Sequence, residues 1–280
     1  FYLKNLFEGG IFRTMFTFRI SEIIQQPNYN ISIRFKDESG SYPAYKAGQF
    51  LTLAFEFGDR EVRRSYSFSS SPSLDEPYEI TVKRVDNGEI SRLLHHRTEV
   101  GEEIQVMDPQ GLFTYEPAEE NNHTVFLFGA GVGVTPLFSI MKTALVAEEN
   151  SKVVLVYSNS SKEQTIFYEE LLNWQKKYPE RLHVEFIWSN SKNLLTARLN
   201  RDYILNLIKE HLNGSLDAVF YTCGPLFYMD LVRFTLLGMG VPEADIKRET
   251  FHFPEEEEDE DEKEEEPVDM TSYDIVLKFQ

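Results

Sequence analysis

Three glycines alternate along the stretch FLFGAGVGVTPLFSIMK and could bring the backbone against a phosphate group. Gly129, Gly131 and Gly133 follow an apolar run and precede a segment with helical spacing. Glycines let the chain approach a pyrophosphate closely, and the first turn of a helix offers free N–H groups at the positive end of its dipole. Thr135 is a candidate cap for this helix, and Pro136 suits its first turn. A tight turn in any α/β protein gives the same pattern, so both interpretations stand.

A second set of side chains able to bind a nucleotide lies in the stretch RRSYSFSSSP. Arg64, Tyr66 and Ser67 follow one another closely near the end of an expected strand. An arginine neutralises a phosphate, a tyrosine stacks on a flat ring, and a serine hydrogen-bonds to a ring edge. The alternative is a polar strand end followed by a serine-rich turn.

A third candidate site lies in VKRVDNGEISRLL. Lys83 and Arg84 end a strand, and Gly88 and Ser91 stand at the start of an expected helix over residues 89–97. Basic side chains beside a helix N-terminus favour an anion. Together with the glycine turn, this arrangement indicates two phosphate-type sites and therefore two nucleotides.

The strand after the glycine turn ends without the acidic residue that often binds a ribose in dinucleotide sites. Ser158 and Asn159 stand there instead, followed by two serines and Lys162. These side chains suit a ribose hydroxyl or a 2′-phosphate, which leaves the choice between NADH and NADPH open.

Cys223 is the only cysteine in 280 residues, so it makes no internal disulfide and no multi-thiolate metal site. No histidine can be tied to it as a base, which argues against a nucleophilic role. It ends an apolar run before Gly224 and Pro225. Parallel sheets bind ligands at such strand ends, and plain core packing is the alternative.

These residues need two kinds of element to position them. Short alternating stretches separated by turn residues fill the chain to about residue 117 and predict an antiparallel barrel or sandwich, with strands at 15–24, 29–38, 48–57, 78–85 and 101–108. From about residue 121, apolar runs alternate with helical segments and predict a doubly wound parallel sheet, with strands at 123–131, 152–160, 182–190, 217–225 and 245–251.

Charge and composition narrow the function further. Residues 255–266 hold eleven acidic residues and one lysine, which leaves −8 of the total charge of −18 for the rest of the chain. We expect residues 254–268 to form a disordered acidic linker, either a spacer or a site for a basic partner.

No basic stripe favours nucleic acid, and no apolar run is long enough for a membrane span. One cysteine and no secretion signal favour the cytoplasm.

Five motifs in order resemble the ferredoxin–NADP⁺ reductase superfamily over residues 12–251. They are the stretches Arg64-x-Tyr66-Ser67, Gly88-x-x-Ser91, Pro109-x-Gly111-x-Phe113, Gly129-x-Gly131-x-Gly133-Val-Thr135-Pro136 and Cys223-Gly224-Pro225. The resemblance implies a six-stranded antiparallel FAD-binding barrel at 12–117 and an NAD(P)-binding α/β domain at 121–253. The layout resembles phenylacetate-degradation-type and oxygenase reductases, in which a plant-type [2Fe–2S] ferredoxin domain follows. It implies that residues 269–280 are the first strand of such a domain, whose cluster lies outside this chain.

The resemblance also implies roles for individual residues. Ser67, Thr135, Cys223 and Glu249 are the implied catalytic residues: Ser67 near flavin N5, Thr135 and Cys223 around the nicotinamide, and Glu249 near the flavin. The implied cofactor-binding residues are Arg64, Tyr66, Ser67, Val82, Lys83, Val85, Gly88 and Ser91 for FAD, Gly129, Gly131, Gly133, Thr135, Ser158, Asn159, Gly224 and Pro225 for NAD(P), and Phe251 or Phe253 as a cover for the flavin.

The function that follows is an FAD-dependent NAD(P)H:ferredoxin-type oxidoreductase. It takes a hydride from NAD(P)H and passes electrons singly to a [2Fe–2S] ferredoxin domain or protein that feeds an oxygenase or hydroxylase. The alternative is a flavin-binding electron-transfer or regulatory subunit with little turnover of its own. No metal site is expected in this chain, since His95 and His96 are adjacent and point apart on a helix.

Overall fold

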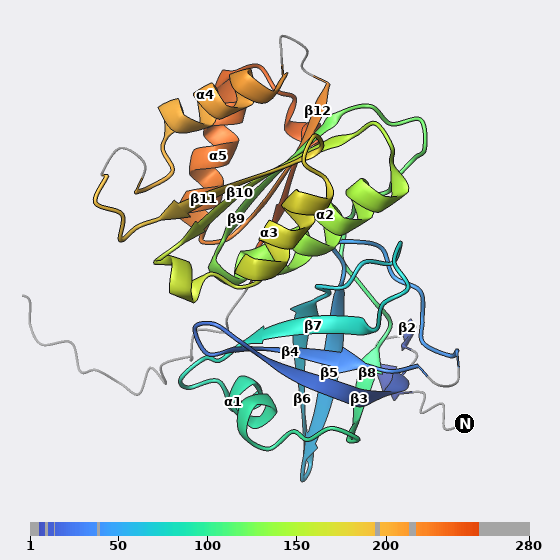
Figure 1. Cartoon of the computed structure of the whole chain (residues 1–280). Helices are drawn as coiled ribbons and strands as arrows, with labels where there is room; N and C mark the ends of the chain where they lie inside the picture. The colour runs from blue at the N-terminus through green and yellow to red at the C-terminus, as the bar shows by residue number, and fades with distance from the viewer. Residues whose placement is uncertain are drawn as a thin grey trace, which may run out of the picture. The chain divides into compact units, whose positions relative to one another are not determined.

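The computed structural model describes residues 6–8, 11–13, 15–37, 40–193, 197–212 and 217–251 (Figure 1). The chain divides into two compact units, residues 1–250 and 251–280, and all described helices and strands lie in the first. The expected linker at 254–268 and the expected strand at 269–280 lie outside the described residues.

A six-stranded antiparallel sheet forms the first part of this unit, in the order β6-β5-β8-β3-β4-β7. The antiparallel bridge between Phe68 and Ile80 joins the end of β6 to β7, so the two edge strands meet and the sheet closes as a barrel. Phe18, Ile33 and Leu53 are fully buried in its core. The strands are β3 (Met15–Gln26), β4 (Asn30–Phe35), β5 (Phe50–Phe57), β6 (Arg60–Ser67), β7 (Tyr78–Lys83) and β8 (Glu103–Met107), with helix α1 (Glu89–His96) between β7 and β8.

The second part is a five-stranded parallel sheet in the order β11-β10-β9-β12-β13. The chain runs from the central β9 outward to β11, then returns to the other side of β9 as β12, so the strand order reverses between β9 and β12. The strands are β9 (Thr124–Ala130), β10 (Lys152–Asn159), β11 (Leu182–Trp188), β12 (Ala218–Cys223) and β13 (Ile246–Glu249). The helices are α2 (Val134–Ala147), α3 (Tyr168–Lys177), α4 (Arg201–Leu212) and α5 (Leu226–Gly238).

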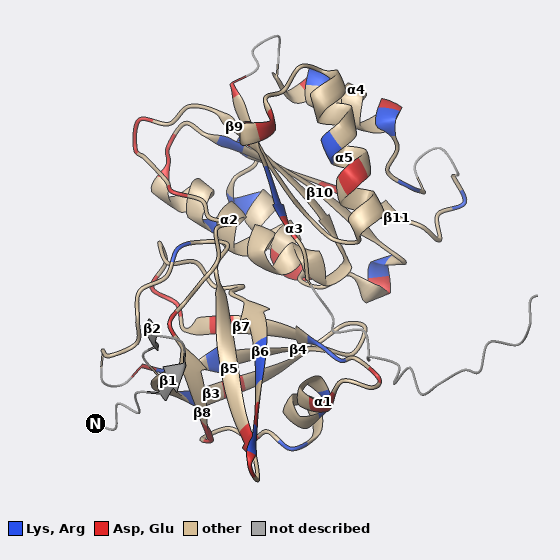
Figure 2. Ribbon diagram, turned by 180° about the vertical axis from the view of Figure 1, so that it is seen from behind, with Lys and Arg blue, Asp and Glu red and all other residues tan. Residues whose placement is uncertain are grey.

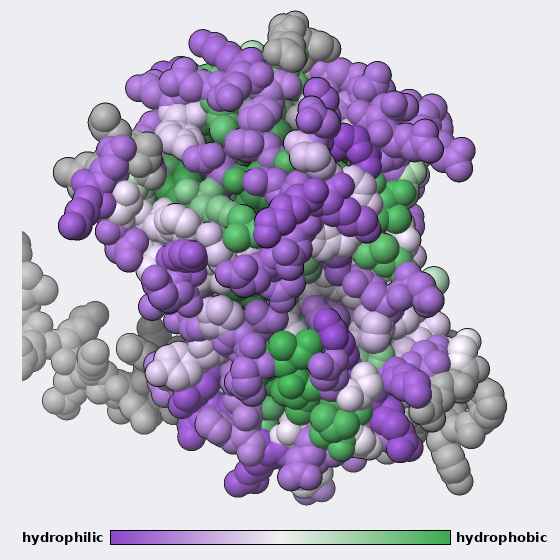
Figure 3. Space-filling view, viewed as in Figure 1, coloured by the Kyte–Doolittle hydropathy of each residue, from purple (hydrophilic) through white to green (hydrophobic). Residues whose placement is uncertain are grey.

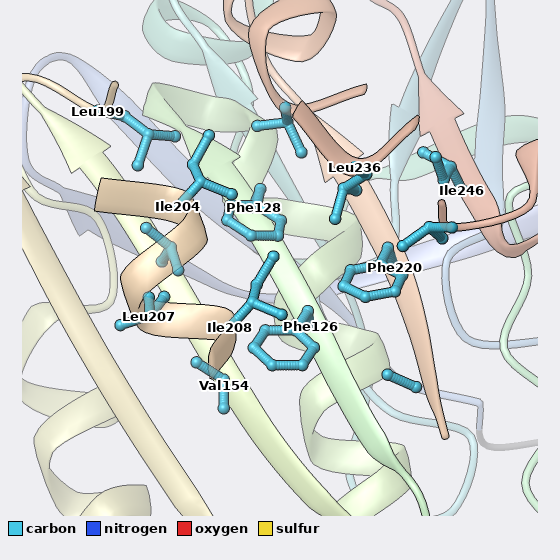
Figure 4. Packing of buried hydrophobic residues seen from close by; sticks show 14 of the residues in the cluster. Phe126, Phe128, Val154, Leu199, Ile204, Leu207, Ile208, Phe220, Leu236 and Ile246 are labelled. Atoms are coloured by element: carbon cyan, nitrogen blue, oxygen red, sulfur yellow. The ribbon is translucent and has the colours of Figure 1, made fainter. Parts of the chain in front are cut away.

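Helices cover both faces of the parallel sheet (Figure 1). α4 and α5 pack on one face, where Ile204 and Ile208 of α4 lie over Phe126 and Phe128 of β9 (Figure 4). α2 and α3 lie on the other face, as a doubly wound sheet requires. Short pieces complete the described elements: strands β1 (Leu6–Glu8) and β2 (Ile11–Arg13) and 3₁₀ turns at Gly131–Gly133, Lys162–Gln164 and Glu243–Asp245.

The fold class expected from the sequence is confirmed, and the structure decides for a barrel over a sandwich. Element bounds differ by only a few residues. The clearest difference concerns Tyr29, which was expected in a strand. β4 begins at Asn30, and Tyr29 lies in the preceding turn with a positive φ of 52°. The predicted strand YNISIRFKDE extended beyond β4 at both ends, to Tyr29 before it and to Lys36 and Asp37 after it. Tyr29 was included because tyrosine is common in strands.

α2 is buried from Val134 to Leu145 because the barrel covers the face turned away from the sheet. Polar side chains that lie three and four positions apart on α2 make the contact with the barrel. The hydroxyl of Ser139 donates to the carbonyl oxygen of Ser70 at 2.5 Å, and the hydroxyls of Thr143 and Ser71 lie 2.7 Å apart. The ammonium of Lys142 lies 2.5 Å from the carboxylate of Glu76. Burial lowers the pKa of Lys142, although Glu76 opposes that shift.

The surface carries charges of both signs. Lys and Arg stand among Asp and Glu on the helices of the parallel sheet and at the tip of the β5–β6 hairpin (Figure 2). Hydrophilic side chains cover most of the face in Figure 3, with a hydrophobic area over strands of the barrel. Within the described ranges, no helix has the length and apolar character needed to cross a membrane.

We expect Glu76→Ala to lower the free energy of unfolding by about 3 kcal/mol, because it leaves the buried Lys142 ammonium without its carboxylate. Urea denaturation measures the change. Glu116→Ala is the matched control, since it breaks the Lys46–Glu116 pair at the same 2.5 Å with both side chains more than half exposed. The control should change stability little. If both substitutions lowered the free energy of unfolding equally, the burial of the Lys142–Glu76 pair would not be what makes it important.

Candidate functional site

Three of the predicted site residues stand side by side at the carboxyl ends of the parallel strands. Gly129 of β9 pairs in register with Cys223 of β12, and Cys223 pairs with Glu249 of β13. Tyr157 of β10 extends the row on the other side of Gly129. The row crosses the point where the strand order reverses, which is where open α/β sheets leave a crevice for ligands.

The glycine turn follows this row directly. Gly131 has a φ of 55°, a backbone conformation that favours glycine, and a Cβ atom there would meet no atom within 4 Å. Gly133 is different, because a Cβ atom there would lie 2.2 Å from the carbonyl oxygen of Cys223. One glycine therefore leaves open space above the turn, and the other allows the start of α2 to pack against the end of β12.

Thr135 does not cap α2, contrary to the sequence-based expectation. The helix begins at Val134 with Gly133 in the cap position, and Thr135 lies inside the first turn. Its side chain is buried and its hydroxyl donates to the carbonyl oxygen of Val132 at 2.8 Å. Pro136 lies in the first turn, as expected. The cap position falls on glycine because the 3₁₀ turn at Gly131–Gly133 runs directly into the helix.

Two tyrosines that the sequence reasoning missed hold the glycine turn in place. The hydroxyl of Tyr157 donates to the carbonyl oxygen of Gly131 at 3.0 Å, and that of Tyr228 donates to the carbonyl oxygen of Gly129 at 3.1 Å. Burial raises the pKa of both phenols, so both stay protonated as donors at neutral pH. Only a weak signal in the sequence marks them: one ends an apolar strand and the other follows Cys223 by five positions.

Polar atoms without partners surround the turn. Among the described residues, the hydroxyl oxygen of Thr222 is buried and makes no hydrogen bond, and the side-chain nitrogen of Asn159 lacks a bond of good geometry, although it lies beside Tyr157. The hydroxyl of Ser158 also lacks a bond of good geometry, although it lies beside Tyr228. Buried polar atoms normally find partners, so these atoms fit a polar ligand at the ends of β10 and β12. Together with the open space at Gly131, they suit a dinucleotide.

Cys223 is fully buried. Burial raises the pKa of its thiol well above the ordinary value, and the neighbouring carboxylate of Glu249 raises it further. The thiol is therefore neutral at physiological pH, which agrees with the argument against a nucleophile. Next to it, Gly224 packs against Ala130 and Pro225 caps α5.

On the barrel, Arg64 and Tyr66 share one face of β6, because side chains alternate along a strand. Ser67 points to the other face and is buried. One nitrogen of the Arg64 guanidinium donates to the carbonyl oxygen of Arg63 at 2.8 Å, which leaves further donors for an anion. Tyr66 packs against the barrel core, and this burial raises the pKa of its phenol.

The turn before α1 is held together by Ser91. Its hydroxyl accepts the backbone N–H of Val85 at 3.1 Å and donates toward the carbonyl oxygen of Gly88 at 3.2 Å. A Cβ atom at Gly88 would lie 2.5 Å from that hydroxyl, so the turn needs glycine here. The amide of Val85, one of the residues implied to bind FAD, is therefore already bonded to Ser91.

The basic residues before this turn differ in their surroundings. Lys83 is exposed, and the side chain of Val82 is buried in the barrel core, so only its backbone can face a ligand. Arg84 is half-buried, and the Nε atom of its guanidinium has no partner among the described residues. Arg84 is thus better placed than Lys83 to bind an anion. The sequence Lys83-Arg84 alone does not show this difference.

The two candidate sites lie within one compact unit. The glycine turn contacts β7 of the barrel, and Ser139 and Thr143 of α2 bond to Ser70 and Ser71, which follow Ser67 closely. Phe251 is the last residue that the structure describes, and Phe253 lies outside the described residues.

Comparisons with known proteins agree with this geometry. Residues 29–115 match the oxidoreductase FAD-binding domain, and residues 127–233 match the oxidoreductase NAD-binding domain. The ferredoxin reductase component of 3-ketosteroid-9-alpha-monooxygenase from Rhodococcus rhodochrous is 37% identical over 237 residues, which cover 83% of this chain and 64% of that protein. A component of the 1,2-phenylacetyl-CoA epoxidase from Escherichia coli is 32% identical, over 75% of this chain and 60% of that protein.

A solved structure shows the same fold. The FAD/NAD-binding domain of nitric oxide dioxygenase from Vibrio cholerae superposes with a TM-score of 0.68 at 27% identity, covering 84% of this chain and 98% of that one. The chain spans less than two thirds of the length of the two curated relatives named above.

We expect Gly133→Ala to destabilise the protein by about 1–3 kcal/mol, because the added methyl group meets the backbone of Cys223 rather than a flexible side chain. Urea denaturation measures the change. Gly238→Ala in α5 is the control, since a Cβ atom there lies no closer than 3.8 Å to Arg201. Alanine favours a helix, so the control should be neutral or slightly stabilising. An unchanged midpoint for Gly133→Ala would disprove the tight contact.

Proposed function

We propose that this chain, which belongs to the oxidoreductases that combine an FAD-binding with an NAD-binding domain, takes a hydride from NAD(P)H. It then passes electrons singly to a [2Fe–2S] ferredoxin domain or protein that feeds an oxygenase or hydroxylase. The observation that carries the proposal is the row of Gly129, Cys223 and Glu249 at the reversal of strand order, beside a glycine turn lined by unpaired polar atoms.

The bound FAD supplies an acceptor for the hydride and releases the electrons one at a time. The chain's own residues bind and orient. Gly131 and the amides at the start of α2 receive the dinucleotide pyrophosphate, and Ser158 and Asn159 bind the ribose next to it. Thr135 and Cys223 flank the nicotinamide. Because the Cys223 thiol is neutral and buried, it shapes the nicotinamide pocket sterically and adds no charge to it.

The barrel supplies the flavin side. Arg64 and Arg84 neutralise the flavin phosphates and Tyr66 stacks on the ring system. Ser67, whose side chain is buried on the other face of β6, would meet the flavin through its backbone. Glu249 stands at the end of β13, in register with Cys223, on the side of the site away from Gly129. This arrangement excludes water and fixes the direction of approach, which is where a protein contributes most to a reaction carried by its cofactors.

The domain bounds that go with this function are 12–117 for FAD and 121–253 for NAD(P). Relatives whose names identify them as parts of a monooxygenase and an epoxidase support an oxygenase as the final acceptor. The proposal also includes a [2Fe–2S] ferredoxin domain or protein that carries electrons from the flavin to this oxygenase.

The direct test uses the purified chain loaded with FAD. We expect a yellow protein whose visible flavin absorbance is lost on adding NADH or NADPH without oxygen. Stopped-flow rates with the two nucleotides decide the preference that Ser158 and Asn159 leave open. A protein that stays colourless after incubation with FAD would exclude the proposed function.

Cys223→Ser should slow flavin reduction about tenfold, a loss of roughly 1.4 kcal/mol in the barrier, while FAD remains bound. The reason is that Cys223 is placed beside the nicotinamide. The smaller, more polar hydroxyl of serine would change the surface that the nicotinamide contacts. Stopped-flow absorbance gives the rate, and the ratio of flavin to protein absorbance gives the FAD content. Loss of flavin with an unchanged rate per flavin would contradict this placement.

A further inference from the structure

The connecting segment, residues 108–123, leads from β8 of the barrel to β9 of the parallel sheet (Figure 1). Part of it still pairs with the barrel, because the backbone N–H of Tyr115 donates to the carbonyl oxygen of Ala47 at 3.0 Å. One residue earlier, the carbonyl oxygen of Thr114 accepts the hydroxyl of Tyr221 in β12 at 2.9 Å. The connecting segment therefore bonds to both sheets.

One carboxylate binds the connecting segment at three positions. Glu148 follows the last residue of α2 and is 1% exposed. Its side chain accepts the hydroxyl of Tyr115 at 2.7 Å, the side-chain amide of Asn121 at 2.7 Å and the backbone N–H of Ala118 at 3.2 Å. These donors come from different parts of the segment, so the carboxylate fixes its course and not only one side chain.

The backbone of Glu148 is fixed independently of its side chain. The guanidinium of Arg181, which precedes β11, donates to the carbonyl oxygen of Leu145 at 2.6 Å and to that of Glu148. These carbonyl groups lie at the end of α2, where the last turn of a helix lacks partners within the helix. The carboxylate therefore stands on a support that belongs to the parallel sheet, while its donors belong to the segment that comes from the barrel.

Glu148 is ionised and Tyr115 is a hydrogen-bond donor at neutral pH. Although burial alone would raise the pKa of Glu148, hydrogen bonds led by those of Ser151 and Tyr115 keep it below the ordinary value. Burial and the neighbouring carboxylate raise the pKa of the Tyr115 phenol, so it stays protonated. The phenol oxygen also lies 3.0 Å from Nε2 of His123, the last residue of the connecting segment. Hydrogen bonds to a charged group are roughly twice as strong as neutral ones, so this cluster resists movement of the segment.

A rigid element joins Glu148 to the proposed nucleotide site. α2 begins at the glycine turn with Val134 and ends at Ala147, directly before Glu148. Ser139 and Thr143 tie the middle of this helix to the barrel, and Glu148 ties its end to the connecting segment. A shift of the segment relative to Glu148 would move the barrel relative to the glycine turn. Hydride transfer needs donor and acceptor in close contact, and a misplacement of about 1 Å can cost roughly 100-fold in rate.

We infer that Glu148 is a positioning residue for hydride transfer: by holding Tyr115 and the rest of the connecting segment, it fixes the barrel at the distance from the glycine turn at which NAD(P)H reaches the flavin. This inference rests on the proposed function and deepens it. Glu148 lies at the end of α2 opposite the glycine turn, so it touches neither cofactor in this arrangement. Its effect is therefore on the rate of the transfer and not on the binding of FAD or NAD(P)H.

The test measures flavin reduction in the full chain loaded with FAD. Stopped-flow traces at increasing NAD(P)H concentration give a limiting rate and a nucleotide dissociation constant for each variant. We expect Glu148→Ala to lower the limiting rate about tenfold to a hundredfold, while the dissociation constant and the FAD content stay unchanged. Tyr115→Phe, which removes one of the donors, should lower the rate less. Glu148→Gln keeps an oxygen that accepts the Tyr115 hydroxyl, so it should recover part of the rate lost in Glu148→Ala.

A matched control uses the same kinds of side chain elsewhere in the chain. The hydroxyl of Tyr203 in α4 donates to the carboxylate of Glu185 in β11, and Nε2 of His183 lies 3.4 Å from that carboxylate. This group belongs to the parallel sheet and its helix, with no part of the connecting segment in it. Glu185→Ala and Tyr203→Phe should therefore lower the melting temperature without changing the limiting rate. The comparison separates positioning from a general loss of stability.

Other results would overturn the inference. They are an unchanged limiting rate in Glu148→Ala, a fall no larger than that in Glu185→Ala, or weaker cofactor binding with an unchanged limiting rate. If Glu148→Ala does not fold, Tyr115→Phe decides by the same comparison with Tyr203→Phe. If the wild type is still reduced by NAD(P)H when the variants fail the prediction, the proposed function stands without this inference. If the wild type binds no flavin, or neither nucleotide reduces it, both fall.

Discussion

The burial of α2 between the parallel sheet and the barrel is the constraint on which the rest of the structure depends. The helix begins at the glycine turn, so its position sets where the proposed dinucleotide pyrophosphate would lie. Its middle bonds to Ser70 and Ser71, which follow the Ser67 end of β6. One rigid helix of fourteen residues thus connects the two candidate sites. In the proposed function, this packing would set how a nicotinamide approaches a flavin.

A helix in this position must satisfy its polar groups away from water. Ser139, Lys142 and Thr143 do so through the barrel, each with a specific partner at hydrogen-bonding distance. Apolar contact completes the junction, because a Cβ atom at Gly48 of the barrel would lie 3.2 Å from the Ile140 side chain. Paired polar groups have directional geometry, so such a junction fixes one arrangement better than a purely apolar one.

Much of this could be predicted from the sequence. Apolar runs and turn residues predicted the strands of both sheets, and the spacing of Gly129, Gly131 and Gly133 predicted the turn between β9 and α2. The ligand site at this turn stays a prediction. What escaped prediction depends on tertiary contact. Tyr157 and Tyr228 bond to backbone carbonyls brought near only by folding. Nothing in a single sequence says that a second layer covers the lysine and serine of α2. Tyr29 looked like the first residue of a strand.

Buried polar atoms with partners and buried polar atoms without partners indicate different roles for the regions in which they lie. Along α2, Ser139, Lys142 and Thr143 all have partners on the barrel, and that region is a structural junction. At the ends of β10 and β12, and around Arg84, the described residues leave buried atoms without a partner of good geometry, among them the hydroxyl oxygen of Thr222 and the Nε atom of Arg84. Leaving a buried donor or acceptor unsatisfied costs about 1–3 kcal/mol, so two such groups in one unit are expensive unless ligands complete them.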